Sequence, residues 1–262
     1  MSTASPTSLL WAKTGGKPPK PLVHPLLCHL VDVAAVALEI WDRVLPASQQ
    51  DLISQVTGCA DAVVAGKILA FWAGVHDVGK ASPGFQGLHP PSRTLLEQAG
   101  LRFERRALNR LHGLLTADAL SVYFAGTTAP GPDAVARGLI AATAGHHGDF
   151  PTAVQSNRLR RWDRGGAEWA DARSHIIGDL AHVLAVSEPI PSGLSPREHW
   201  FFMFLAGLTS VADWIGSSER WFSFERYPDD LDRYFAEARE KAARAIDEVG
   251  WTRWQPIQSA TE

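Results

Sequence analysis

A histidine and an aspartate stand next to each other where a long apolar run ends, in Trp72-Ala73-Gly74-Val75-His76-Asp77-Val78-Gly79-Lys80. A neutral imidazole can bind one metal ion, and a carboxylate has two oxygens that can bridge two ions. Gly79 allows the left-handed conformation that ends many helices, and Lys80 places a cation where a phosphate oxygen could bind. Because such a pair can also serve in capping or packing, the prediction of a metal site depends on further ligands.

Four further segments place imidazole or carboxylate groups inside or at the ends of apolar helices that the sequence predicts. They supply His29, His112, the consecutive pair His146 and His147, and Asp213. Each has a structural alternative, since a single histidine on an apolar face, such as His112, is more often a packed core residue. Burying all of them without partners would cost several kcal/mol in sum, at roughly 1–3 kcal/mol each. One shared metal site would satisfy them together.

Five imidazoles and two carboxylates are too many ligands for one ion, but they suit two ions bridged by Asp77 and a water. Such a histidine-rich set favours Mn, Fe, Co or Ni over Mg, which prefers oxygen ligands. Two ions of this kind acidify the bridging water and stabilise both the attacking and the leaving oxygen of a phosphoester. The chemistry that fits best is phosphodiester hydrolysis.

The elements that must position these residues are predicted to be helices. Apolar or amphipathic periodicity predicts them over residues 25–38, 61–76, 105–123, 133–143, 167–186, 197–216 and 231–249, with a turn or short helical piece over 82–89. No convincing strand pattern or internal repeat is present. The predicted fold class is therefore all-α.

Three polar residues lie at or near the first of these helices. His29 and Asp32 share one face at i and i+3, so on a buried helix both need hydrogen bonds or a ligand. His24 precedes the helix, and we expect it at the surface or in a capping role. His89, before two prolines, is expected in an exposed loop.

A basic segment follows the double histidine closely. Four arginines surround one tryptophan in it: Arg158, Arg160, Arg161, Trp162 and Arg164. A solvated loop or helix face is one interpretation. The other is a DNA-binding surface that guides a strand, with Trp162 or Trp169 offered for base stacking.

Composition narrows the class of protein. With 262 residues and 45% hydrophobic content the chain can bury a substantial core, and a net charge of −3 does not indicate a general polyanion binder. Cys28 and Cys59 form no disulfide framework, which favours a reducing cytoplasm. No secretory signal is visible, and the apolar run over residues 200–212 is too short to span a bilayer. We expect a cytoplasmic protein without membrane contact.

The two ends of the chain carry no helical periodicity. Residues 1–20 are predicted to be a flexible N-terminal arm and residues 251–262 a C-terminal tail, leaving residues 21–250 as one domain. Gly15-Gly16-Lys17 is not a phosphate loop, because Trp11 stands where the first glycine should be and Pro18 replaces serine or threonine. We therefore expect no ATP to be bound by this chain.

The ligand pattern resembles a known family. The residues that carry the resemblance are His29, His76-Asp77-Val78-Gly79-Lys80, His112, His146-His147 and Ala212-Asp213-Trp214. Together they are similar to the HD-superfamily nuclease domain of the type I CRISPR-associated nuclease–helicase, over about residues 20–250. A histidine–aspartate pair alone is shared by a very large phosphohydrolase superfamily, and the other elements make the resemblance specific.

The resemblance implies a dinuclear metal site in an all-α HD domain. One ion is expected on the residues His29, His76, Asp77 and Asp213, and the other on Asp77, His112, His146 and His147. Asp77, Lys80 and Ser217 are the expected catalytic residues, with Lys80 contacting the scissile phosphate and Ser217 assisting near the substrate. The family cuts a displaced single DNA strand after recruitment to a CRISPR RNA-guided surveillance complex, while a helicase driven by ATP feeds in the strand.

The expected function is therefore metal-dependent endonucleolytic hydrolysis of single-stranded DNA in CRISPR interference, an antiviral defence. No helicase domain follows residue 262, so we expect a stand-alone nuclease subunit or an excised domain that works with a helicase domain or subunit. A first alternative is an HD phosphohydrolase acting on nucleotides or cyclic dinucleotides, which a closed pocket would favour and an open groove lined by residues 158–164 would oppose. A second is a non-catalytic subunit in which the metals only stabilise the fold.

Overall fold

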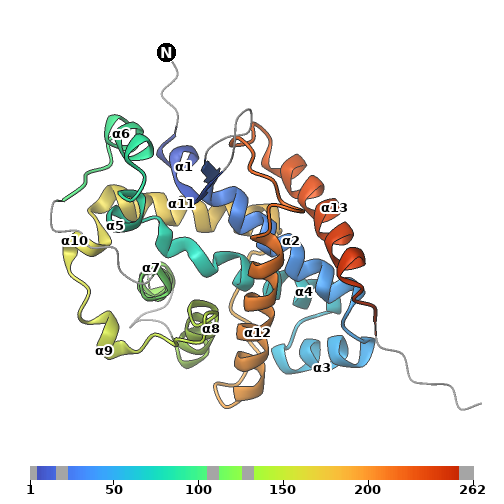
Figure 1. Cartoon of the computed structure of the whole chain (residues 1–262). Coiled ribbons are helices and arrows are strands. Elements are labelled where there is room, and N and C mark those ends of the chain that lie inside the picture. Colours follow the sequence, from blue (N-terminus) through green and yellow to red (C-terminus); the bar gives the residue numbers. More distant parts are fainter. Residues whose placement is uncertain (1–4, 16–22, 105–111, 126–132, 254–262) are drawn as a thin grey trace, which may run out of the picture.

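The central element is α2, Leu26–Arg43, whose residues from Leu26 to Trp41 are all buried. Its side chains are apolar on nearly every side, so neighbouring helices can pack around its whole circumference. α4, α12 and α13 make the most extensive of these contacts. In Figure 1, α13 runs beside α2 along the upper right of the molecule. The first predicted ligand, His29, thus lies inside the core.

The computed structural model describes residues 5–15, 23–104, 112–125 and 133–253. Within them the chain forms almost only helices (Figure 1). In chain order these are α1 (Pro6–Leu9), β1 (Trp11–Thr14), β2 (Val23–Pro25), α2, α3 (Ala47–Thr57), α4 (Ala62–Gly74), the 3₁₀ helix η1 (Val75–Lys80), α5 (Pro83–Gln86), α6 (Pro90–Gln98), α7 (His112–Ala125), α8 (Ala134–Ala144), α9 (Ala153–Ser156), α10 (Arg161–Arg164), α11 (Ala167–Val183), α12 (His199–Gly216) and α13 (Leu231–Val249).

α4 leads directly into the histidine–aspartate pair, and the helical winding changes just before the pair. Asp61 caps the start of α4, because the side chain accepts a hydrogen bond of 2.9 Å from the backbone N–H of Val64. After Gly74 the chain tightens into η1, which contains His76 and Asp77. A 3₁₀ segment joined to an α-helix is a frequent form of helix end. This tighter winding turns the side chains of His76 and Asp77 toward α7 and α12.

Gly79 is needed for a different reason from the predicted one. Its backbone is not left-handed; instead, η1 lies directly against the first turn of α7. A Cβ at this position would come within 2.3 Å of the His112 carbonyl oxygen and of the Thr116 nitrogen. The Thr116 hydroxyl also accepts a hydrogen bond from Gly79 N at 3.0 Å and donates one to the His76 carbonyl oxygen at 2.9 Å. The prediction of a left-handed glycine was wrong.

The all-α fold class is confirmed, with one addition. β1 and β2 form an antiparallel two-stranded ribbon in which Trp11 faces Pro25 and Lys13 faces His24. Residues 5–15 of the predicted flexible arm are thus attached to the domain, because Leu10 and Trp11 bury their side chains. The remainder of that arm, residues 1–4 and 16–20, lies outside the described residues. Of the predicted tail, residues 251–253 are described and exposed.

Most predicted helices are confirmed to within a few residues. The part of the predicted helix over residues 105–111 lies outside the described residues. α3 and α6 were not predicted. Among the described residues one helical stretch, Ala62–Lys80, meets the length and composition of a membrane span, but 78% of its most apolar window is buried inside the protein, as in a core helix.

Candidate metal centre

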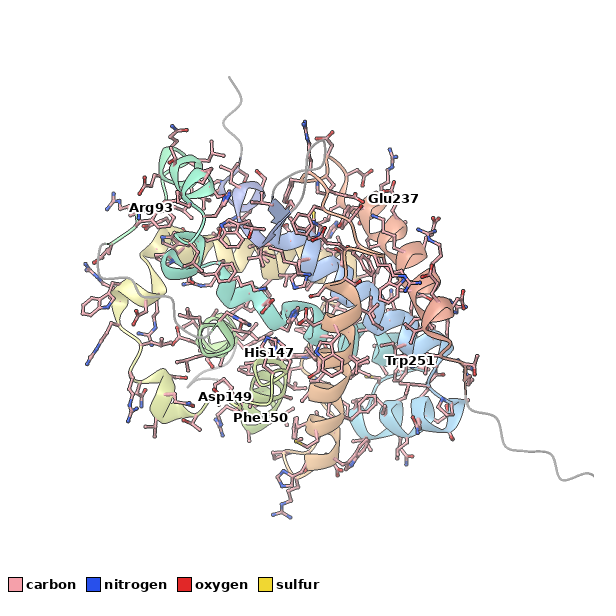
Figure 2. All side chains as sticks on the ribbon, in the orientation of Figure 1. Arg93, His147, Asp149, Phe150, Glu237 and Trp251 are labelled. Carbon is pink, nitrogen blue, oxygen red and sulfur yellow. The ribbon has the colours of Figure 1, made fainter. Side chains whose placement is uncertain are left out.

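Five separate elements bring all seven predicted ligands to one place. α2 carries His29, η1 carries His76 and Asp77, and α12 carries Asp213. The other three ligands lie at the start of α7 and just after the end of α8: His112, His146 and His147. Figure 2 shows His147 near the middle of the view, where α7 and α8 approach α12.

Asp77 lies between two groups of imidazoles. Its Oδ2 is 3.2 Å from His29 Nε2 and 3.3 Å from His76 Nε2. Its Oδ1 is 3.2 Å from His112 Nε2 and 3.9 Å from His146 Nε2. The two oxygens of one carboxylate therefore face two different ligand groups, as a bridging carboxylate would.

The first ligand group is buried. Asp213 Oδ1 completes it at 3.5 Å from both His29 Nε2 and His76 Nε2. The ligand atoms of His29, His76, Asp77 and Asp213 all lie within 4.8 Å of one another. Four nitrogen and oxygen donors at this spacing can surround one divalent transition-metal ion.

The second ligand group reaches the surface. Its three histidines, whose ligand atoms also lie within 4.8 Å of one another, range from buried His146 through partly exposed His112 to exposed His147. The Nε2 atoms of His112 and His147 are 3.2 Å apart. Together with Asp77 Oδ1 these three imidazoles can hold a second ion, on the side from which a substrate can approach.

The ring orientations fit metal binding. His76 Nδ1 lies 2.9 Å from the Ala73 carbonyl oxygen, and His146 Nδ1 lies 2.9 Å from that of Thr143. A carbonyl only accepts, so each Nδ1 donates, and in a neutral ring Nε2 carries the lone pair. Both Nε2 atoms and Asp77 Oδ1 are buried without a hydrogen-bond partner. Buried polar atoms without a partner are costly, and cations bound at the two ligand groups would satisfy all three.

The electrostatics of the centre keep the carboxylates ionised. Burial alone would raise the pKa of Asp77, but the Lys80 ammonium and the adjacent imidazole of His76 hold that pKa well below its usual range. The pKa of Asp213 is likewise held low against its burial, mainly by His76. Ionised carboxylates are the form that binds metal.

Three of the ligand histidines differ in protonation in the metal-free protein. Burial lowers the pKa of His29 well below its usual value, and burial together with the charge of His76 lowers the pKa of His146 to about 4. Burial would also lower the pKa of His76, but Asp77 and Asp213 outweigh it and raise that pKa to about 9. A metal ion at the buried ligand group must therefore displace the proton of His76.

The other two predicted catalytic side chains contact the carboxylates of the centre. Lys80 Nζ is 2.6 Å from Asp77 Oδ2. The Ser217 hydroxyl donates a 2.6 Å hydrogen bond to Asp213 Oδ1. Ser217 thus orients a candidate ligand, a role that the sequence did not suggest.

Only some side chains of the basic segment, residues 158–164, are available for contact with a substrate. Arg164 makes two hydrogen bonds to the Asp118 carboxylate, at 2.8 and 2.7 Å, which fix it to α7. Arg161 lies 3.3 Å from Glu104, whereas Arg158 and Arg160 are exposed and Trp162 is half-buried. Trp169 is fully buried and its indole N–H donates to a backbone carbonyl, so the prediction that it could stack on bases was wrong.

His24 and Asp32 form a second buried cluster, apart from the metal ligands. His24 Nε2 is 2.9 Å from Asp32 Oδ2, and the Tyr234 hydroxyl donates to Asp32 Oδ1 at 2.9 Å. His24 is only 1% exposed, so its predicted surface position was wrong. The reason is that it belongs to β2, a strand that the sequence did not reveal. His89 is half-buried and caps α6.

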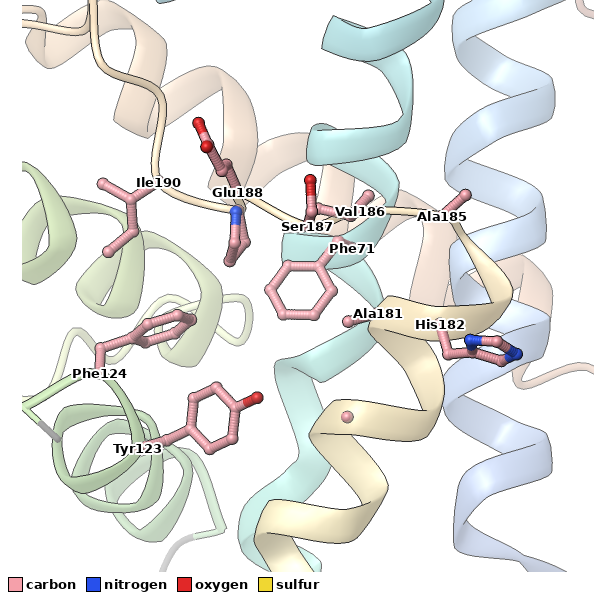
Figure 3. Close-up of a pocket in the computed structure, with 12 residues that line it drawn as sticks. Phe71, Tyr123, Phe124, Ala181, His182, Ala185, Val186, Ser187, Glu188 and Ile190 are labelled. Carbon is pink, nitrogen blue, oxygen red and sulfur yellow. The ribbon is translucent and has the colours of Figure 1, made fainter. Parts of the chain in front are cut away.

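A large cavity lies away from the candidate ligands. It has a volume of about 920 Å³, and its lining comes from α4, α7, α11 and the loop after α11. Figure 3 shows the rings of Phe71 and Tyr123 around it, with Ala181 and Ile190 on other sides. A much smaller cavity of about 70 Å³ borders His112 and His147.

Comparison with known proteins agrees with this geometry. The family model described as "Cas3, HD domain" matches residues 11–222. The chain is 30% identical over 259 residues to the CRISPR-associated endonuclease/helicase Cas3 of Thermus thermophilus. The aligned region covers 98% of this chain and 27% of the relative. The chain thus spans about a quarter of the length of the curated relatives that it matches.

Two solved structures superpose over nearly the whole chain. One is a crystal structure of a CRISPR-associated protein, with a TM-score of 0.83 and 36% identity over 98% of this chain and 28% of that one. The other is the Thermus thermophilus Cas3 HD domain crystallised in the presence of Ni²⁺, with a TM-score of 0.69 and 28% identity over 94% of this chain and 92% of that one.

Proposed function

The chain belongs to the Cas3 HD-domain family, and on that basis we propose that it is a metal-dependent endonuclease that cuts single-stranded DNA in CRISPR interference. Family membership supports a metal-dependent nuclease role in CRISPR defence. The position of Asp77 between two ligand groups is the observation that carries the finer statement. It favours two metal ions and hydrolysis of a phosphodiester.

The residues divide into two holding groups. His29, His76, Asp77 and Asp213 would hold the buried ion, and the second would be held by Asp77 with His112, His146 and His147. The ligand chemistry fits Mn, Fe, Co or Ni better than Mg, and the related HD domain was crystallised with Ni²⁺. When bound, two such ions supply an activated water and neutralise charge on the phosphate.

Other groups of the protein orient the metal ligands, and Lys80 supplies positive charge near the phosphate. Ser217 fixes Asp213 through its hydroxyl, and the backbone carbonyls of Ala73 and Thr143 fix the rings of His76 and His146. Lys80, 2.6 Å from Asp77, is placed to contact the phosphate that is cut. Exposed His147 marks the side on which the strand would approach.

Strand guidance is assigned to the exposed part of the basic segment. Arg158, Arg160 and Arg161, with half-buried Trp162, are the proposed DNA-binding residues. Arg164 already binds Asp118, so its contribution is to hold this segment on α7. The proposed setting is the cytoplasm, with a helicase domain or subunit and a CRISPR RNA-guided surveillance complex as partners. This follows the relative named as an endonuclease/helicase.

The geometry does not favour a small-molecule phosphohydrolase. Pockets that enclose small ligands usually measure about 300–1,000 Å³, whereas the cavity beside His112 and His147 has about 70 Å³. The 920 Å³ cavity has that size but is lined mainly by apolar side chains and by none of the candidate ligands. A metal centre that opens at His147 suits a polymer lying across it.

The test is cleavage of circular single-stranded DNA. Metal-stripped protein is incubated with the circle after addition of Mn²⁺, Co²⁺, Ni²⁺ or Mg²⁺, beside an Asp77→Ala variant and a panel of mononucleotides and cyclic dinucleotides. The proposal expects metal-restored cutting of the circle that Asp77→Ala lacks. Hydrolysed nucleotides with an intact circle would favour the phosphohydrolase. No hydrolysis, together with a lower melting temperature of Asp77→Ala, would favour a purely stabilising metal site.

A further inference from the structure

Lys13 is a partly buried ammonium without a partner. It lies on β1, opposite His24 of β2. No hydrogen bond or ion pair of its side chain is found within the described residues, whereas burial lowers its pKa to about 8. An ammonium that is removed from water without an acceptor is unfavourable. Such a group is suited to an anion that binds from outside.

One end of β1 is fastened to the segment that carries Lys80. Gln86, which is fully buried, donates hydrogen bonds to the Trp11 carbonyl oxygen at 2.8 Å and to that of Lys80 at 2.9 Å. The Trp11 ring packs on Phe85 at 4.6 Å between centroids, and Lys80 Nζ lies 5.4 Å from the same ring. β1 therefore has a fixed position beside η1.

The other end of β1 approaches the end of α12. A Cβ at Gly15 would lie 3.8 Å from Glu219 Oε1, two residues beyond Ser217. β1 also contacts η1 directly, the helix that carries Asp77 and Lys80. Lys13 thus lies at the metal centre, between η1 and the C-terminal end of α12.

The two lysines of the centre differ in what they bind. Lys80 is 2.6 Å from Asp77 Oδ2, so its charge is already paired. Lys13 has no carboxylate oxygen within 4.0 Å among the described residues. We propose that Lys13 binds a backbone phosphate of the DNA strand next to the phosphate that is cut. This inference rests on the proposed nuclease function, and it assigns a second lysine to the substrate.

The chemistry of the contact is that of an ammonium on a phosphate oxygen. Lysine binds phosphate as a compact point charge on a flexible stem, without the fixed two-point geometry of arginine. A strand with one phosphate at the metal ligands would then have a neighbouring phosphate at Lys13 on β1. In this role Lys13 binds substrate and does not hold metal.

The experiment compares Lys13→Met, Lys13→Arg and wild type, with Lys67→Met as the matched control. Lys67 is also a partly buried lysine without an ion pair among the described residues, but it lies on α4, away from the ligands. Cleavage of a short single-stranded oligonucleotide by Mn²⁺-loaded protein is followed over a series of NaCl concentrations to obtain KM and kcat. Mn²⁺ affinity and melting temperature are measured in parallel.

We expect Lys13→Met to raise KM while kcat changes less than about twofold. The slope of log KM against log salt should fall by about 0.7, the value for one phosphate contact on a single strand, which amounts to about a fivefold loss at 0.1 M salt relative to 1 M. Lys13→Arg should keep the wild-type slope, and Lys67→Met should match wild type. Mn²⁺ affinity should not fall, and the melting temperature should not fall, because an unpaired, partly buried charge is removed.

Two results would overturn the inference alone. A wild-type salt slope in Lys13→Met would show that no phosphate is bound there, and a loss of Mn²⁺ affinity would show that Lys13 acts through the ligands. In both cases wild type still cuts the oligonucleotide, so the proposed function stands. If wild type cuts no single-stranded DNA, the proposed function and this inference fail together.

Discussion

At the residue scale, the centre depends on the protonation of a few buried groups. Asp77 and Asp213 are held ionised, His29 and His146 are held neutral, and His76 is held protonated in the metal-free protein. Most of these donors are therefore in the form that binds metal, and His76 must lose its proton before it can do so.

A pH dependence of metal affinity follows from His76. Its pKa of about 9 means that it is charged at neutral pH, whereas a ligand must be neutral. Between about pH 6 and pH 8 the apparent dissociation constant should therefore rise about tenfold for each unit by which the pH falls. The dependence should vanish above about pH 9. Calorimetric Mn²⁺ titrations in buffers of different ionisation enthalpy should show release of about one proton; no proton release would contradict the assignment.

Ser217 provides a test of ligand orientation. Ser217→Ala removes the hydrogen bond to Asp213 Oδ1, and loss of such an outer contact typically weakens metal binding by about 10–100-fold. The neighbouring Ser218 makes no hydrogen bond to Asp213 in the structure, so Ser218→Ala serves as the control. Competition with a fluorescent metal chelator measures both variants. Equal metal affinities of the Ser217→Ala and Ser218→Ala variants would show that Ser217 does not orient Asp213 for metal binding.

The sequence identified the seven candidate ligands because each is a polar residue in or beside an apolar run. It did not reveal how they are arranged. The two Asp77 oxygens contact residues that are far apart in the chain. The cluster that buries His24 also joins distant residues. His24 was misplaced for this reason, since that cluster includes Tyr234, which lies 202 residues after Asp32.

At the element scale, the contact between η1 and α7 decides where His76, Asp77 and His112 lie relative to one another. Thr116 bonds to both ends of the histidine–aspartate turn, and Gly79 lets the two backbones approach. The long helices were predicted because apolar periodicity reports burial. The contact between η1 and α7 was not predicted. Neither were the strands β1, of four residues, and β2, of three residues, because such short segments carry no periodic signal.

Gly79→Ala should therefore be strongly destabilising. A Cβ at 2.3 Å from two backbone atoms cannot be absorbed by a side-chain movement, so the cost should reach the upper part of the usual range for overpacking, about 2–3 kcal/mol. Urea unfolding monitored by circular dichroism measures it.

Gly207→Ala is the matched control for this substitution. Gly207 is helical, in α12, and a Cβ added there would have no neighbouring atom within 4 Å. Its replacement should stabilise the protein by about 0.5–1 kcal/mol. A Gly79→Ala variant as stable as wild type would mean that η1 and α7 are not in this close contact.

At the scale of the whole molecule, the metal ligands come from five elements spread from α2 to α12, so metal binding should stabilise the entire fold. At a free metal concentration of 100 times the dissociation constant, each bound ion adds about 2.7 kcal/mol. For a domain of this size that corresponds to about 5–10 °C in melting temperature. Differential scanning fluorimetry with Mn²⁺ or with EDTA measures the shift.

The Asp77→Ala variant is the control for that shift. It should lose most of the Mn²⁺-dependent stabilisation, since both ligand groups share this carboxylate. An equal shift in the variant would place the stabilising ion elsewhere in the molecule.

We propose that Asp77 contributes one oxygen to each of two metal ions, and electron paramagnetic resonance of the Mn²⁺-loaded protein measures whether the two ions are coupled. Two Mn²⁺ ions joined by a carboxylate are magnetically coupled, whereas isolated ions give the simple six-line signal of single Mn²⁺. We expect two ions per chain by metal analysis and a coupled spectrum in wild type, with the coupling lost in Asp77→Ala. One ion per chain, or two ions with uncoupled spectra in wild type, would contradict it.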